Sequence, residues 1–245
     1  LSGLAGSYHL QGNIEEAQNC YNRALEIFND IGNEQGCSQV RANLGLICQS
    51  LGDLSSAEDH LQKSLESRDG SDLSGYAGVK LSLGLTAQLR GDWDGAQEHF
   101  EQAARAYDDL GDKAGFSLAQ NNLGNLHSDR GDARKAILCY NLSIDAKRSC
   151  GDREGMATTL ANLAACYHQE RDHERAEKIY QESLQIFREA GEGKGEGRAL
   201  LGLAGLKADM GSLKESLRHF RESLSIEIEQ EDSSGIIAAL YGLAN

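Results

Sequence analysis

The chain contains no proline, so its helices must begin and end without the residue that most often interrupts them. Glycine occurs 28 times, and it stands with Asp and Asn at the predicted helix ends. Glycine suits a left-handed cap at the end of a helix, and Asp suits the first position of the next one. No segment alternates apolar and polar residues long enough to indicate a strand. The pattern therefore predicts an all-α protein.

Basic residues and long apolar runs are also scarce. The chain has 24 basic and 38 acidic side chains, a formal charge of -14. Nucleic acids and anionic membranes both select basic surfaces, so neither is an expected partner. No apolar run approaches the ~20 residues of a membrane span, and no secretory leader is visible. A neutral or basic polypeptide is the partner that fits this charge.

The six cysteines contain no C-x-x-C pair. Cys20 and Cys139 both follow a repeat glycine by eight residues, which indicates packing rather than a disulfide framework. We therefore expect a reduced, cytoplasmic setting.

A glycine recurs at a nearly constant interval along the whole chain. The series is Gly12, Gly52, Gly91, Gly131, Arg171 and Gly211, with steps of 40, 39, 40, 40 and 40. Gly36, Gly75, Gly115, Gly155, Gly195 and Gly235 form a second series, with steps of 39, 40, 40, 40 and 40. Such a period is typical of a solenoid, in which supersecondary units stack on one another. We predict repeats at 1–35 (partial), 36–74, 75–114, 115–154, 155–194, 195–234 and 235–245 (partial), forming one domain over 1–245 that is open at both ends.

The second repeat is one residue short, and the residue is missing between Leu65 and Gly75. The segment 67–72 is unusually polar. We predict a shortened second helix there, followed by the most mobile loop of the chain. An ordinary loop deletion without function is the alternative.

Positions that recur from unit to unit resemble the tetratricopeptide repeat. The leucine-glycine pair appears as Leu44-Gly45, Leu83-Gly84 and Leu123-Gly124. Small residues follow in the second helix at Ala17, Ala57, Ala96, Ala136, Ala176 and Ser216, and four residues later stand Tyr21, Leu61, Phe100, Tyr140, Tyr180 and Phe220. The period near forty is similar to that of the long-repeat subclass, which includes the Leu-Gly-Asn-rich spindle-orientation adaptors and bacterial regulatory proteins. The resemblance implies a right-handed α-solenoid of about six stacked helix-turn-helix repeats, whose first helices line a concave peptide-binding groove.

Amide side chains flank the leucine-glycine pairs and are the candidate binding residues. Asn121, Asn122 and Asn125 share one face of a predicted helix, since residues three and four apart are neighbours there. An amide offers a donor and an acceptor, so a ladder of amides suits the backbone of an extended peptide. The alternative is that these amides only bridge neighbouring repeats. The predicted concave face also includes Asn43, Asn162, Gln39, Gln49, Arg41 and Arg198.

No motif for catalysis, phosphate binding or metal binding is recognised, so we expect no enzyme activity, no cofactor and no metal. His60, His99 and His219 share one repeat position, which indicates half-buried packing. Cys166, His168 and His173 lie near one another in sequence, but a zinc site needs three or four ligands within reach.

The most direct functional interpretation is a scaffold that captures a peptide or helix in its concave groove. A second is a sensor or regulatory arm of a larger multidomain protein, such as an NTPase or a protease effector, because the chain reads as a segment of a longer solenoid. A third is an architectural role, in which the open ends associate with other copies.

Overall fold

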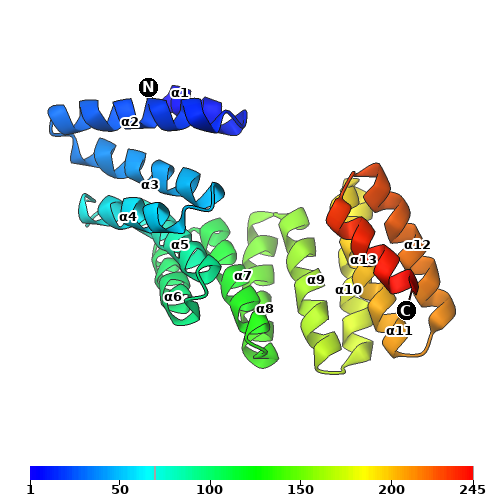
Figure 1. Cartoon of the computed structure of the whole chain (residues 1–245). Helices are drawn as coiled ribbons and strands as arrows, with labels where there is room; N and C mark the ends of the chain where they lie inside the picture. Colours follow the sequence, from blue (N-terminus) through cyan, green and yellow to red (C-terminus); the bar gives the residue numbers. More distant parts are fainter. Residues whose placement is uncertain (69, 245) are drawn as a thin grey trace. The chain divides into compact units, whose positions relative to one another are not determined.

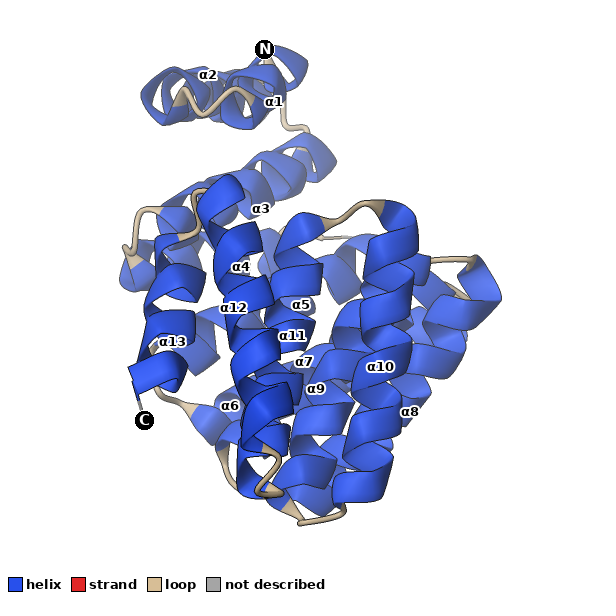
Figure 2. Ribbon diagram, turned by 90° about the vertical axis from the view of Figure 1, so that its right-hand side faces the viewer, coloured by secondary structure: helices blue, strands red, loops and turns tan. Residues whose placement is uncertain are grey.

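The computed structural model describes residues 1–68 and 70–244, and within them every regular element is an α-helix (Figures 1 and 2). The first six are α1 (Ser2–Leu10), α2 (Ile14–Asp30), α3 (Glu34–Ser50), α4 (Leu54–Glu66), α5 (Leu73–Leu89) and α6 (Trp93–Asp109). The others are α7 (Lys113–Asp129), α8 (Ala133–Cys150), α9 (Arg153–Gln169), α10 (His173–Ala190), α11 (Gly193–Asp209), α12 (Leu213–Glu229) and α13 (Ser233–Ala244). The predicted class, an α-solenoid of stacked helical repeats, is confirmed.

The chain divides into two compact units, Leu1–Ala119 and the part from Gln120 onward, and the division falls within α7. In the first unit, α3 packs against both α4 and α5. In the second, α9 packs against α10 and α11, and α11 packs against α12 and α13. The first helices α3, α9 and α11 therefore each contact their own second helix and the next first helix, which is how stacked repeats share a core. The extent of a single domain over 1–245 stays a prediction.

The turns explain how the helices end without proline. Nine glycines have a positive φ, among them Gly12 at 78° and Gly131 at 77°, a conformation that only glycine adopts without strain. The next helix then begins with a side-chain cap, as where the Asp92 carboxylate accepts a hydrogen bond from the Gly95 amide at 3.0 Å. Such a cap satisfies one of the backbone donors that a helix start leaves unpaired. Arg171 and Glu231 are the described non-glycine residues with positive φ.

Close helix crossings explain the repeated small residues. Ala96, Ala136 and Ala176 are completely buried on the second helices. A Cβ atom added at Gly84 would lie 2.5 Å from the Phe100 ring, and one at Gly124 would lie 2.5 Å from the Tyr140 ring. Glycine is therefore required where an aromatic ring of the second helix meets the backbone of the first. This contact explains why glycine follows leucine in the recurring leucine-glycine pair.

The second repeat is short in the predicted place. α4 contains 13 residues, whereas α8 and α10 contain 18 each. The shortened second helix is thus confirmed. Asp69, in the segment predicted to be mobile, lies outside the described residues, and the mobility of that segment stays a prediction.

A position near the end of each second helix alternates between aromatic and charged residues, which sequence reasoning missed. It is occupied by Phe28, Arg68, Tyr107, Lys147, Phe187 and Glu227, at steps of 40, 39, 40, 40 and 40. Each of these side chains reaches the glycine near the start of the next first helix. We call it the wedge position, since it lies between neighbouring repeats. The regular spacing of these six residues is the feature of the sequence from which the wedge position could have been predicted.

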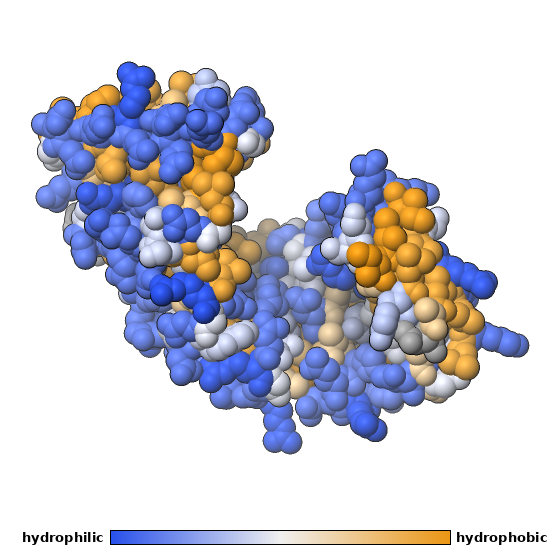
Figure 3. Space-filling view, viewed as in Figure 1, coloured by the Kyte–Doolittle hydropathy of each residue, from blue (hydrophilic) through white to orange (hydrophobic). Residues whose placement is uncertain are grey.

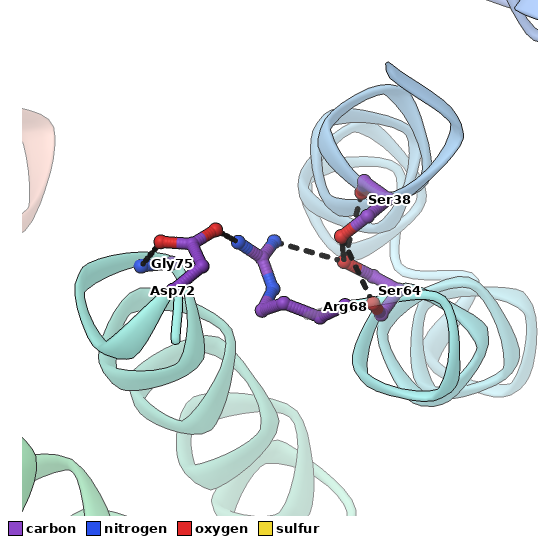
Figure 4. A network of polar contacts seen from close by, with 5 residues as sticks. All are labelled: Ser38, Ser64, Arg68, Asp72 and Gly75. Carbon is purple, nitrogen blue, oxygen red and sulfur yellow. Dashed lines mark hydrogen bonds and ion pairs between the residues drawn. The ribbon is translucent and has the colours of Figure 1, made fainter. Parts of the chain in front are cut away.

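Arg68 is the first charged residue at the wedge position, and its side chain is only 7% exposed. Its guanidinium pairs with the Asp72 carboxylate and donates to Ser64 Oγ at 3.2 Å (Figure 4). Ser64 Oγ in turn donates to the Ser38 carbonyl oxygen at 2.8 Å, and Asp72 Oδ1 caps the Gly75 amide at 2.9 Å. The Arg68 guanidinium thus links α4 to the start of α5, and Ser64 extends the network to α3, where other repeats use an aromatic ring.

Replacing Arg68 with Lys is expected to lower the free energy of unfolding by about 1 kcal/mol. A lysine ammonium can still meet Asp72, but it lacks the planar fork that also reaches Ser64. Urea denaturation and amide hydrogen exchange in α4 and α5 measure the loss. The matched control is Arg90→Lys, because Arg90 pairs with Glu58 on the exposed surface, where an ion pair contributes little. Equal losses in the two variants would contradict a structural role for the buried fork.

Candidate functional site

The exposed sides of the first helices form the surface on which the candidate residues lie. We call this surface the first-helix wall and describe it separately for α3 and α5 in the first unit and for α9, α11 and α13 in the second. In the first unit α3 contacts α5, and in the second α11 contacts both α9 and α13. Side chains on these helices therefore adjoin across repeats, which is the arrangement that a long ligand requires.

In the second unit, three of the predicted asparagines hold neighbouring helices together. Asn125 Oδ1 accepts hydrogen bonds from Tyr140 Oη at 2.8 Å and from Asn162 Nδ2 at 3.2 Å. Asn121 Oδ1 lies 3.1 Å from Thr159 Oγ1 and accepts its hydrogen bond. These bonds link α7 with α8 and α9. The geometry matches the bridging alternative for these three amides, because part of their hydrogen-bonding capacity is used within the protein.

Asn122 differs from its two neighbours. It is half-buried on the same helix, and its amide makes no hydrogen bond with any other described residue. Asn43, at the equivalent position of α3, is also half-buried and has no such bond in the described part of the chain. These two amides keep their donors and acceptors available to a ligand.

In the first unit, two predicted residues are engaged within the protein and one is exposed. Gln49 Nε2 donates to Thr86 Oγ1 at 3.1 Å and so joins α3 to α5. Arg41 Nη1 donates to Ser67 Oγ at 2.7 Å, which ties α3 to the segment after α4. Gln39 is exposed, without a hydrogen bond to another described residue.

Arg198 is exposed near the start of α11. It lines an open hollow of about 330 Å³ with residues that include Glu154, Thr158, Phe187 and Lys194. Two cationic side chains and two carboxylates, those of Glu154 and Glu192, thus face the same space.

Exposed leucines on the first helices are the feature that the sequence analysis missed. Leu46 on α3 is 37% exposed and Leu89 at the end of α5 is 63% exposed. In the second unit, Ile237, Leu240 and Tyr241 are exposed on α13, and Figure 3 shows hydrophobic side chains gathered over that helix. Exposed apolar side chains that adjoin are typical of interaction surfaces. The sequence could have revealed them, because each is an apolar residue on the side of the helix opposite the buried leucine.

The candidate metal-binding residues do not come together as a site within the described ranges. No three His, Cys, Asp or Glu residues of the described ranges form a group that could hold a metal ion. Cys166 is buried, whereas His168 Nε2 faces Asp209 Oδ2 at 2.8 Å. His60, His99 and His219 are half-buried as predicted, and burial lowers the pKa of each. None of the helices in the described ranges combines the length and apolar character needed to cross a membrane.

Comparison with known proteins identifies the repeats. The family profile described as tetratricopeptide repeat matches residues 1–69, 76–149 and 155–227. The chain belongs to the tetratricopeptide repeat family. Repeats of this family are protein-interaction scaffolds and are generally not enzymes. No curated protein matches the sequence.

Solved tetratricopeptide structures share the fold at low sequence identity. BtubC from P. vanneervenii is 16% identical, with 89% of this chain and 92% of that chain covered and a TM-score of 0.77. A signal-transduction ATPase with a tetratricopeptide repeat sensor from Pyrococcus horikoshii is 16% identical with a TM-score of 0.86. There 99% of this chain is covered, but only 37% of that protein. A Rap protein in complex with the competence and sporulation factor is 14% identical, with 87% and 61% covered and a TM-score of 0.68.

Proposed function

We propose that the chain binds a polypeptide segment, an amphipathic helix or an extended peptide, along its first-helix wall. The partner is neutral or basic and contributes apolar side chains to the contact. Asn43, Asn122, Gln39 and Arg198 supply polar contacts beside the leucines, and Asn121, Asn125, Asn162, Gln49 and Arg41 keep the wall in register.

The exposed leucines of α3 and α5 carry this proposal. Leu46 and Leu89 lie on helices that contact each other, and placing them in water costs free energy that a partner would recover. Leu46 stands three residues after the available amide of Asn43 on α3, and such a combination of apolar and polar groups suits a ligand that has one apolar and one polar face. The formal charge of -14 favours association with a basic segment. The Rap protein bound to the competence and sporulation factor supports the proposal as an example of the fold holding a partner.

The double variant Leu46→Ser and Leu89→Ser is expected to weaken binding at least tenfold, which corresponds to a loss of about 1–3 kcal/mol. The ligand is a peptide selected from a displayed random library on the wild-type chain. Its affinity for each variant is measured by isothermal titration calorimetry. Because both leucines are exposed, helix content should be unchanged.

The matched control is Leu138→Ser with Leu142→Ser on the second helix α8, where both leucines are also exposed. A second variant, Asn43→Ala with Asn122→Ala, tests the available amides. The proposal fails if the α8 variant loses affinity while the variant of the first-helix wall binds as the wild type does.

A sensor or regulatory arm within a larger protein is the second candidate. It is favoured by the match to the Pyrococcus horikoshii ATPase, in which a segment of similar fold serves as the sensor. Sequencing the complete gene tests it: an adjoining nucleotide-binding or hydrolase domain supports the sensor role, and a gene that encodes only repeats counts against it.

A further inference from the structure

The turn between α9 and α10 differs from the equivalent turns of the other repeats. Arg171 occupies the position that holds Gly12, Gly52, Gly91, Gly131 and Gly211 elsewhere. Its φ is 61°, in the left-handed region where a side chain is strained. Glycine would adopt this φ with a lower conformational free energy, so the turn itself does not require an arginine.

The same turn borders an open hollow of about 490 Å³. It is lined by His168 and Gln169 at the end of α9, Arg171, His173 at the start of α10, and Asp209 at the end of α11. The two imidazole rings meet edge to face, with their centroids 5.8 Å apart. All of these elements belong to the second unit, so the hollow is formed within one compact body.

The nearby carboxylates are already engaged with other side chains. Asp209 Oδ2 lies 2.8 Å from His168 Nε2. Asp172 Oδ1 accepts from the Arg175 amide at 3.1 Å, and Asp172 Oδ2 lies 3.3 Å from Arg175 Nε. The guanidinium of Arg171 makes no ion pair or hydrogen bond with another described residue.

We propose that this hollow, formed by Arg171, His168, His173 and Gln169, is a binding site for an oxyanion, either a carboxylate or a phosphate. The site lies at the joint of two repeats and is separate from the exposed leucines proposed to bind a polypeptide.

The donor set fits an oxyanion better than other ligands. A guanidinium presents a planar fork that matches two oxygens of a carboxylate or phosphate. Gln169 adds an amide donor, and the imidazole of His173 can add an N–H, whereas His168 Nε2 is engaged by Asp209. A metal cation is disfavoured, since Arg171 faces the space and the described residues hold no group of metal ligands there. Asp209 contributes one negative charge to the lining, and its Oδ2 atom is turned toward His168 Nε2, 2.8 Å away.

The test uses the whole chain with ¹³C-labelled histidine. Inorganic phosphate is titrated at constant ionic strength, and acetate is titrated in a second series, while the ring signals of His168 and His173 are followed by NMR. Saturable shifts of both rings are expected. Arg171→Gly is expected to weaken this binding at least tenfold, the loss of one charge-assisted hydrogen bond, and its thermal midpoint should equal or exceed that of the wild type.

Two further variants separate charge from backbone geometry. Arg171→Gln keeps a side chain at the left-handed position, so it should lose anion binding as Arg171→Gly does. Arg134→Gln removes an exposed arginine from α8, outside the hollow, and should bind as the wild type does. A site that prefers phosphate to acetate indicates a phosphorylated ligand, and the reverse indicates a carboxylate. Absence of saturable shifts, or equal binding by Arg171→Gly and the wild type, overturns the proposal.

Discussion

Replacing Phe100 with Ala is expected to lower the free energy of unfolding by about 3–5 kcal/mol. The Phe100 side chain is completely buried (0% exposed) on α6. Its ring lies against the backbone of α5 at Gly84, so its removal leaves a cavity between the two helices of one repeat. The close approach of the two helices depends on this ring and on the absence of a side chain at Gly84. Neighbouring side chains cannot close the gap without moving the backbone.

Urea denaturation followed by circular dichroism measures this loss, and amide hydrogen exchange locates it. The largest loss of protection should appear in α5 and α6, because each repeat contacts mainly its neighbours. Trp93→Ala on the same helix is the matched control: it removes a larger side chain that is 38% exposed, and it should cost much less. If the two variants lose equal stability, the ring-to-glycine contact is not what holds this repeat together.

Replacing Glu227 with Gln is expected to stabilise the protein at neutral pH by about 1–3 kcal/mol. Glu227 is the last charged residue at the wedge position and is 2% exposed. It lies between Gly197 of α11 and Gly235 of α13, and its Oε2 atom has no hydrogen-bond partner among the described residues. Burial raises the pKa of this carboxyl, and the nearby Asp232 raises it further, while Arg198 and Lys194 act in the opposite direction. A glutamine keeps the shape and removes the buried charge.

The raised pKa predicts the direction of the pH dependence. The folded protein holds the Glu227 proton more tightly than the unfolded chain does, so stability falls as the pH rises above the unfolded value of about 4.3. The penalty is complete once the pH exceeds the raised pKa of the folded state. The difference between Glu227→Gln and the wild type should therefore be small near pH 4 and largest at neutral pH.

Chemical denaturation of both proteins between pH 4 and pH 8 measures that difference. Glu229→Gln, at an exposed position two residues later on α12, controls for the change in net charge. A constant difference across this range, or an equal gain from Glu229→Gln, would contradict the assignment of the effect to the buried carboxyl. Loss of the α13 contacts should accompany any rise in pH that ionises Glu227, and hydrogen exchange in α13 reports it.

The architecture was predictable because its determinants are local and recur. A left-handed turn needs glycine, a helix start needs a cap, and a close crossing needs alanine or glycine, and each requirement reappears every repeat. The shortened α4 was visible for the same reason, since one missing residue breaks a regular count. These requirements concern residues that are close in sequence or one repeat apart, so they can be recognised in a single sequence.

The roles of the candidate side chains were decided by the tertiary structure. Asn122 and Asn125 have the same chemistry and lie three residues apart, yet Asn125 is bonded to Tyr140 and Asn162, and Asn122 has no partner in the described ranges. Composition cannot distinguish a bridging amide from an available one, because the difference depends on which side chains of other helices lie within 3 Å or so.

The sequence by itself therefore determined an all-helical stack of tetratricopeptide repeats and the places where its helices turn. Only the tertiary structure decided that Arg68, Lys147 and Glu227 are buried where other repeats place an aromatic ring, and that Arg171 borders a hollow with two histidines. The physical reason is that turns and crossings depend on local backbone geometry, whereas burial and electrostatic environment depend on contacts between residues that are distant along the chain.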